Sequence, residues 1–204
     1  MILRGYVQAG GGSTRFGTDK ALVQVSGKTM LQHACELLAD ICDDVAIVAP
    51  AGRYGSMAWP VLADRWPGQG PLGGILTALY TMKNSQAGAA WALITSCDMP
   101  FLTGEFLVFL RERALTSQAQ VVVPQSANGL EPLCACWRAS ASAGVQLAFD
   151  SGVRKVTDAM KRLPMEVLDE PVWKRFDTES RLFWNMNTPE DFAEARRILE
   201  APGQ

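Results

Sequence analysis

The sequence lacks a strong charge of either sign, any long apolar run and, apart from one residue, histidine. Across 204 residues the formal net charge is −2, whereas nucleic-acid-binding domains usually carry a large basic excess. No uninterrupted apolar run approaches the ~20 residues that cross a bilayer, and the apolar stretch at the start is too short for a secretory signal. We therefore expect a soluble, cytoplasmic protein that binds neither nucleic acid nor a membrane.

Cysteine occurs five times, but in no pattern that is typical of a metal site or a disulfide framework. The number is odd, and no CxxC pair or histidine gives zinc-binding spacing. Cys134 and Cys136 alternate in an apolar run, as buried small hydrophobic residues do. The sequence thus indicates structural thiols in a reducing compartment. The single histidine, His33, lies off the apolar stripe of its predicted helix, which favours a solvent-facing position over a catalytic one.

Short apolar runs alternate with helical patterns, which is typical of a mostly parallel sheet with helices on both faces. The runs predict strands over residues 5–9, 45–49, 61–62, 91–95 and 121–123. Helical spacing predicts helices over residues 75–82, 104–115 and 139–149, and two that begin after Thr29 and Thr188, each at a capping-box pattern. Because chains divide into domains beyond ~250 residues, we expect a single Rossmann-like α/β domain over residues 1–204.

The first predicted strand ends in three consecutive glycines, Gly10, Gly11 and Gly12. Residues without side chains let the backbone approach a phosphate closely and turn its amides toward it. Arg15 and Lys20 follow, and they add a fork of donors and a compact positive charge. The spacing is that of neither the P-loop, whose lysine directly follows its last glycine, nor the dinucleotide fingerprint. The segment predicts a phosphate-binding turn of another kind.

One carboxylate follows a predicted buried strand, at the edge where open α/β sheets bind ligands. Residues 91–95 are apolar, and Asp98 comes three residues later. Magnesium commonly takes only one or two protein carboxylates, because phosphate oxygens and waters complete its octahedron. Asp98 is therefore a candidate magnesium ligand, and a helix-capping aspartate is the alternative.

Residues 8–20 resemble the signature of the MobA-like nucleotide transferases, which runs leucine–alanine–glycine–glycine, a spacer, arginine and then aspartate–lysine. Residues 97–100 are similar to the family's cysteine–aspartate–methionine–proline element. This family has a Rossmann-like fold of the nucleotide-diphospho-sugar-transferase kind, and it includes molybdenum cofactor guanylyltransferases. The resemblance implies that Arg15 meets the phosphates of GTP and that Asp98 binds magnesium and nucleotide. It also implies that the nucleotide is bound by Lys20 and by the turn of Gln8, Ala9, Gly10, Gly11 and Gly12.

Other segments extend the resemblance over nearly the whole chain. Asp64 aligns with an aspartate that contacts guanosine, and Gly70 lies in a glycine–proline–leucine loop that would let a base or ribose rest against the backbone. Glu131, Asn185 and Asn187 lie in segments similar to those that approach the acceptor pterin. The sequence departs from the family at Gln8, where leucine is usual, and after the second strand, where an asparagine is usual.

The resemblance implies transfer of GMP from GTP to the phosphate of molybdopterin, with release of pyrophosphate. Arg15, Lys20 and Asp98 would be the catalytic residues and Mg²⁺ the cofactor. Residues 1–110 would bind the nucleotide and residues 111–204 the acceptor. Proteins that make molybdopterin or mature molybdoenzymes would be partners. The alternatives are a cytidylyltransferase, a nucleotide-binding accessory protein without catalysis, and a nicotinamide-dependent oxidoreductase, whose glycine spacing is absent.

Overall fold

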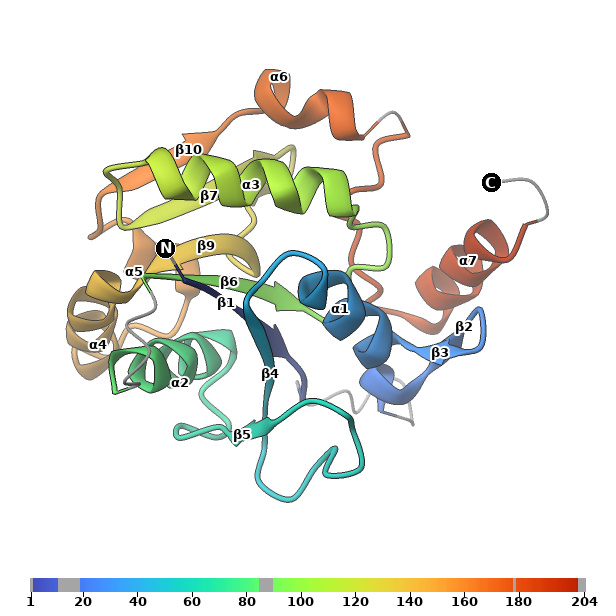
Figure 1. The fold of residues 1–204 in the computed structure, drawn as a ribbon, viewed down its shortest axis with the longest axis horizontal. Coiled ribbons are helices and arrows are strands. Elements are labelled where there is room, and N and C mark those ends of the chain that lie inside the picture. The colour runs from blue at the N-terminus through green and yellow to red at the C-terminus, as the bar shows by residue number, and fades with distance from the viewer. Residues whose placement is uncertain (1, 11–18, 85–89, 178, 202–204) are drawn as a thin grey trace.

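The computed structural model describes residues 2–10, 19–84, 90–177 and 179–201 (Figure 1). Its centre is a sheet in the order β10-β7-β9-β6-β1-β4-β5, with the short strand β8 paired to β7. The strands are β1 (Leu3–Gln8), β4 (Asp44–Ala49), β5 (Val61–Ala63), β6 (Trp91–Ser96), β7 (Val121–Ser126), β8 (Gly129–Leu130), β9 (Cys134–Arg138) and β10 (Met165–Leu168). Along this order every pairing is parallel except the two made by β9. The prediction of a mostly parallel sheet is confirmed.

Helices cover both faces of the sheet. One face carries α1 (Met30–Ala39), α3 (Gly104–Thr116) and α6 (Glu170–Trp173), and the other carries α2 (Pro71–Lys83), α4 (Ser142–Asp150) and α5 (Val156–Met160). The last helix, α7 (Pro189–Leu199), lies beside the hairpin of β2 (Gln24–Val25) and β3 (Lys28–Thr29), away from the sheet (Figure 1). Single 3-10 turns are η1 (Lys20–Leu22), η2 (Ala139–Ala141) and η3 (Lys174–Phe176). None of the helices in the described ranges is long and apolar enough to span a membrane.

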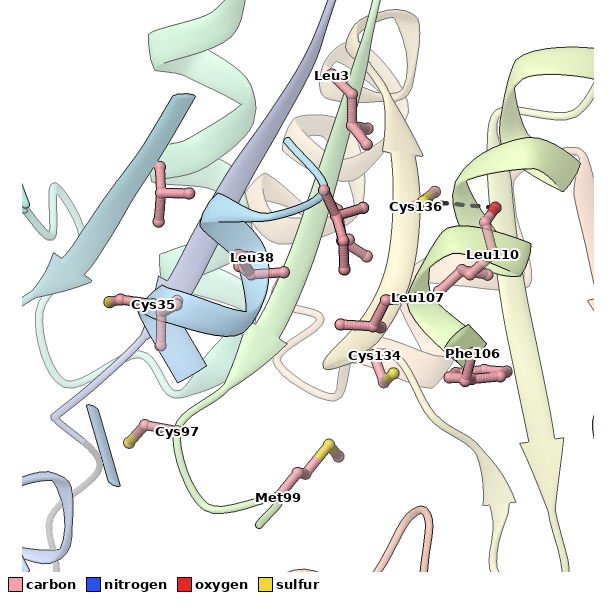
Figure 2. Packing of buried hydrophobic residues seen from close by; sticks show 14 of the residues in the cluster. Leu3, Cys35, Leu38, Cys97, Met99, Phe106, Leu107, Leu110, Cys134 and Cys136 are labelled. Atoms are coloured by element: carbon pink, nitrogen blue, oxygen red, sulfur yellow. Dashed lines mark hydrogen bonds between the residues drawn. The ribbon is translucent and has the colours of Figure 1, made fainter. Parts of the chain in front are cut away.

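The central strand β6 shows how the two layers share one core. Trp91 and Leu93 belong to the buried cluster under α1 and α3, whereas Ala92 and Ile94 belong to the cluster under α2 and α4. Strands that are buried on both faces have nearly continuous apolar sequences, as β6 has. Figure 2 shows the first cluster, in which Leu38 of α1 and other apolar side chains pack on the sheet. Full burial of each large apolar side chain stabilises the fold by roughly 1.5–3 kcal/mol.

Strand β9 is a strand that the sequence did not predict. Its side chains alternate, with Cys134 and Cys136 facing α3 and with Ala135 and Trp137 on the other face. The thiol of Cys136 donates to the Leu110 carbonyl at 3.9 Å (Figure 2). All four side chains are buried, so the expectation for the two cysteines is confirmed. Burial raises the pKa of both thiols, which keeps them protonated and inert.

Two further predictions need correction. Helix α2 begins at Pro71, four residues before the predicted start, because Gly70 at φ +71° turns the chain and proline suits the first helical position. His33 does not face the solvent freely: it is half-buried, and its Nε2 lies 2.9 Å from the Val25 carbonyl oxygen. The histidine thus links α1 to the β2–β3 hairpin.

Both predicted capping boxes are present, and the one at α1 can be tested on stability. The Thr29 hydroxyl accepts from the Gln32 amide at 3.1 Å, and the Gln32 side chain accepts from the Thr29 amide at 2.8 Å. Thr29→Ala leaves helix amides unpaired, so we expect the free energy of unfolding to fall by about 1 kcal/mol. Urea denaturation measures this change, and Thr29→Ser is the control that retains the cap. Equal stability of the alanine and serine variants would contradict the prediction.

Candidate active site

A cavity of about 610 Å³ opens where β1, β4 and β6 end. This volume lies within the range of small-molecule sites. Its walls come from residues 8–10, 48–50 and 96–98, which follow these strands, and from residues 19–21, Asp64, Gly68, Gly70, Pro71, Gly74, Leu133 and Asn187. In the sheet β1 lies between β4 and β6. The strand order therefore changes direction at β1, with β4 and β5 on one side and β6 on the other. Ligands of open α/β sheets bind at such a switch point.

The turn after β1 requires glycine at position 10. Gly10 has φ +111°, and a Cβ atom there would lie 2.4 Å from Cδ of Pro50. Gln8 fills the space beneath α2: its Nε2 donates to the Pro71 carbonyl at 3.2 Å, and a Cβ on Gly74 would lie 2.8 Å from its amide. The Gln8 side chain therefore ties β1 to the start of α2, which gives this departure from the usual leucine a structural reason.

Lys20 and Asp98 are held at the same cavity by the backbone of one residue. The Lys20 ammonium donates to the Met186 carbonyl at 2.7 Å and lies 3.5 Å from Oδ1 of Asn187. The Met186 amide in turn donates to the Asp98 carbonyl at 3.0 Å. Residues far apart in sequence thus place a cation and a carboxylate beside one ligand space. Such a pair can bind a metal-bound triphosphate, with the carboxylate on the metal ion and the ammonium on the phosphates.

The carboxylate of Asp98 suits a magnesium ion that is shared with a ligand. It is half-buried, lines the cavity and accepts a short hydrogen bond from the Ser96 hydroxyl. Within the described part of the chain, no three histidine, cysteine or acidic side chains cluster as a metal site would require. A closed, all-protein metal site is therefore not built from these residues. A single cavity carboxylate is the donor set that magnesium uses when phosphates and waters supply the other ligands.

Asp64 organises the loop on the opposite wall. Its Oδ1 accepts from the Trp66 amide and from the Thr77 hydroxyl, both at 3.0 Å. These bonds join the end of β5 to the middle of α2. Gly68 and Gly70 follow at φ +76° and +71°, and both line the cavity. The loop therefore presents a backbone without side chains to whatever occupies this wall.

A family model described as the MobA-like NTP transferase domain matches residues 5–163. The chain belongs to the MobA-like NTP transferase family. It is 36% identical over 198 residues to a molybdenum cofactor guanylyltransferase of Rhodopseudomonas palustris, covering 94% of this chain and 91% of the relative. It is 32% identical over 202 residues to a probable molybdenum cofactor guanylyltransferase of Chloroflexus aggregans, covering 94% and 92%.

Solved structures show the same fold. The molybdopterin-guanine dinucleotide biosynthesis protein A of Archaeoglobus fulgidus superposes with a TM-score of 0.81 at 24% identity, covering 96% of this chain and 97% of that one. The 2-C-methyl-D-erythritol 4-phosphate cytidylyltransferase of Thermus thermophilus superposes with a TM-score of 0.71 at 16% identity, covering 98% and 100%. The predicted fold, a Rossmann-like, mostly parallel sheet with helices on both faces, is confirmed.

The three residues predicted for the acceptor occupy different positions in this member of the MobA-like family. Asn187 is exposed and lines the cavity beside Lys20. Asn185 is half-buried, does not line the cavity, and donates to the Phe183 carbonyl at 3.2 Å. Glu131 is 8% exposed and accepts from the Ser126 hydroxyl at 2.6 Å, two residues before Leu133 at the cavity wall. Of the three, only Asn187 borders the ligand space.

Some residues of the site were missed and some predicted ones lie elsewhere. Gly11, Gly12 and Arg15 lie outside the described residues, and their roles stay predictions. Sequence reasoning gave no role to Asp19, although it precedes Lys20 in the motif. It also missed Arg53 and Tyr54, which lie in the loop after β4 and contact Asp19. The loop has no periodic pattern, so no sequence signal pointed to them.

The tight turn at Gly10 predicts a loss of nucleotide binding when a side chain is added. Gly10→Ala would force the turn away from Pro50, and a positive φ costs an L residue roughly 1–2 kcal/mol. We expect the affinity for GTP with Mg²⁺, measured by titration calorimetry, to fall by roughly tenfold or more. Gly152→Ala is the matched control, because Gly152 has φ +86°, open space around it and a position outside the cavity lining. Unchanged affinity in Gly10→Ala would refute the role of this turn.

Burial raises the pKa of the Glu131 carboxyl above its usual value, although the hydrogen bond from Ser126 lowers it. The folded protein therefore holds this proton more tightly than the unfolded chain does. The stability that the protonated form provides is lost as pH rises through the folded pKa. We expect the free energy of unfolding of Glu131→Gln, relative to that of the unsubstituted protein, to rise as pH increases from about 4 to about 7. Urea unfolding across this range measures the gain, and a relative loss would contradict it.

Proposed function

We propose that this chain is a molybdenum cofactor guanylyltransferase, which transfers GMP from GTP to the phosphate of molybdopterin and releases pyrophosphate. The observation that supports it most is the placement of Lys20 and Asp98 at one cavity, joined through the Met186 backbone. The Rhodopseudomonas relative is named a molybdenum cofactor guanylyltransferase and the Chloroflexus relative a probable one, and the matches cover 91% and 92% of their lengths. The reaction class, nucleotidyl transfer, is that of the MobA-like family.

The reaction needs no protein base. A phosphate monoester is already anionic near neutral pH, so its oxygen attacks the α-phosphorus directly, opposite the leaving pyrophosphate. One P–O bond forms to the acceptor as the bond to the pyrophosphate oxygen breaks. Catalysis then consists of positioning and of stabilising charge as it develops. We assign the stabilisation of the negative charge on the leaving pyrophosphate to Lys20 and, as predicted from the sequence, to Arg15.

Asp98 would hold a magnesium ion, whose charge neutralises the triphosphate when it is bound. Asp98 itself is oriented from two sides: the Ser96 hydroxyl donates to its Oδ1, and the Met186 amide donates to its main-chain carbonyl. Such support fixes the direction of the carboxylate before any ligand arrives. Asp98 is thus preorganised for its role.

The opposite wall would receive the nucleoside. Asp64 and the backbone of Gly68 and Gly70 line this part of the cavity, next to the Gln8–Gly74 contact. Base or ribose can lie close to such a backbone because no side chains intervene. We assign most of the nucleotide site to residues 1–110, in agreement with the sequence prediction.

The acceptor would enter from the side of Asn187, which belongs to the second half of the chain, residues 111–204. Asn187 borders the cavity next to Lys20. Asn185 and Glu131 do not line the cavity, so they would support the acceptor side from behind its wall. A cytoplasmic location and contacts with proteins that make molybdopterin or mature molybdoenzymes complete the proposal.

An assay of pyrophosphate release with GTP, Mg²⁺ and molybdopterin tests the function and the role of Asp98 together. Asp98→Asn removes the charge while preserving shape, and we expect kcat to fall at least about 100-fold. Asp150→Asn is the matched control, since Asp150 is exposed and ends α4. Comparison of GTP with CTP separates a guanylyltransferase from a cytidylyltransferase. If no nucleoside triphosphate is turned over, the enzymatic function is rejected.

A further inference from the structure

The loop after β4 reaches across to the residue that precedes Lys20. Oδ2 of Asp19 accepts from the Tyr54 hydroxyl at 2.7 Å and also from the Arg53 guanidinium. Its other oxygen, Oδ1, accepts from the Ala21 amide at 3.1 Å and so caps the 3-10 turn that starts with Lys20. One carboxylate therefore joins the Lys20 turn to a loop more than thirty residues away.

Tyr54 is held in an unusual backbone conformation. Among the described residues only three that are not glycine have positive φ, and two of these, Ser26 and Ser180, are exposed serines. Tyr54 has φ +58° yet is buried in the same cluster as Ala21 and Cys97. A bulky residue in this region costs of order 1–3 kcal/mol and persists only where surrounding contacts impose it. Here the contacts are the packed ring and the bond from its hydroxyl to Asp19.

The hydroxyl of Tyr54 acts as a donor and not as a phenolate. Burial raises the pKa of this hydroxyl, and the bond to Asp19 raises it further. The proton therefore stays on the hydroxyl near neutral pH. The Asp19 carboxylate accepts it, and the direction of the hydrogen bond is settled.

Lys20 is thereby held at both ends. Its main chain begins the turn that Asp19 caps, and its ammonium donates to the Met186 carbonyl at 2.7 Å. A lysine side chain has several rotatable bonds, so its ammonium is placed reliably only when its Cα is fixed. Displacement of the turn would move the ammonium relative to Asp98 on the far side of Met186.

Arg53 has a separate electrostatic effect. Asp19 itself lines the cavity, and its side chain is 17% exposed. An uncompensated carboxylate there would repel a triphosphate. The Arg53 guanidinium, 46% exposed, pairs with Asp19 and offsets that charge. Because the pair is partly screened by solvent, its effect should weaken as salt rises.

We propose that Tyr54 is a positioning residue of the nucleotide site, which acts through the Asp19 carboxylate to fix the turn that carries Lys20, and that Arg53 offsets the charge of the same carboxylate. The inference rests on the proposed function, because it assigns the residues to the cation that meets the triphosphate. A loop anchor without this role would stabilise the fold and leave the action of Lys20 unchanged. The two cases differ in whether the effect of a Tyr54 substitution on GTP affinity requires Lys20 to be present.

A double-mutant cycle between Tyr54→Phe and Lys20→Met tests this dependence. The phenylalanine retains the packed ring and removes only the hydroxyl. In the protein with Lys20, we expect Tyr54→Phe to lower the affinity for GTP with Mg²⁺ and kcat/KM about tenfold, the usual effect of losing one hydrogen bond to a charged group. In the Lys20→Met protein, Tyr54→Phe should change neither quantity, because the group that it positions is gone. Equal losses in both backgrounds would overturn the proposal.

One control and one further series of variants complete the test. Tyr80→Phe removes the hydroxyl of an exposed tyrosine on α2 and should leave affinity unchanged. Arg53→Met should weaken GTP affinity at low salt, with the loss reduced at high salt and largely restored in Arg53→Lys. If Lys20→Met binds too weakly to be titrated, this arginine series decides alone: a loss that is independent of salt, or not restored by lysine, refutes the inference.

The affinity measurements separate this inference from the proposed function. A protein that binds GTP but transfers nothing to molybdopterin would refute the proposed acceptor chemistry, while the cycle on GTP affinity still reports the coupling of Tyr54 to Lys20. A protein that turns over GTP normally while the cycle is additive would refute only the positioning role.

Discussion

The site depends on one short stretch of backbone, the peptide groups on either side of Met186. The Met186 carbonyl accepts from Lys20 and its amide donates to Asp98, while its side chain is buried with Val25, Met30 and Ala195. A segment near the end of the chain therefore sets the distance between a cation from the first turn and a carboxylate from the central strand. The Met186 backbone thus links the turn that carries Lys20 to the loop that carries Asp98. The Met186 side chain is anchored in its own small core between α7 and the β2–β3 hairpin.

The second half of the chain reaches the same cavity through the antiparallel strand β9. Its pairing with β6 brings the Leu133 carbonyl to the Ser96 amide at 3.0 Å. Ser96 in turn donates to Asp98. A strand running against its neighbours thus delivers its first residues to the edge where the parallel strands end. The second half of the chain is thus coupled to the Asp98 carboxylate, the proposed magnesium ligand, by ordinary sheet hydrogen bonds.

Among the described residues, three carboxylates line the cavity beside the Lys20 ammonium. Asp19, Asp64 and Asp98 all line it. Asp19 is offset by Arg53 and Tyr54, and Asp64 is satisfied by the Trp66 amide and the Thr77 hydroxyl. Asp98 accepts from Ser96 and faces the ligand space. The carboxylates therefore differ because their partners differ: two organise the walls, and the third, Asp98, is the proposed magnesium ligand.

The sequence by itself determined the class of fold, both capping boxes, the burial of the β9 cysteines and the candidate roles of Gly10, Lys20 and Asp98. These features are local, since strand periodicity, caps and a glycine turn depend on residues a few positions apart. Only the tertiary structure decided what touches Lys20 and Asp19. Arg53 and Tyr54 come from a loop without a pattern of its own, and Met186 comes from a segment that the resemblance linked only to the acceptor. Their partners lie 34 to 166 residues away. Strand β9 and the inward turn of His33 were missed for the same reason, because each depends on neighbours that only folding brings together.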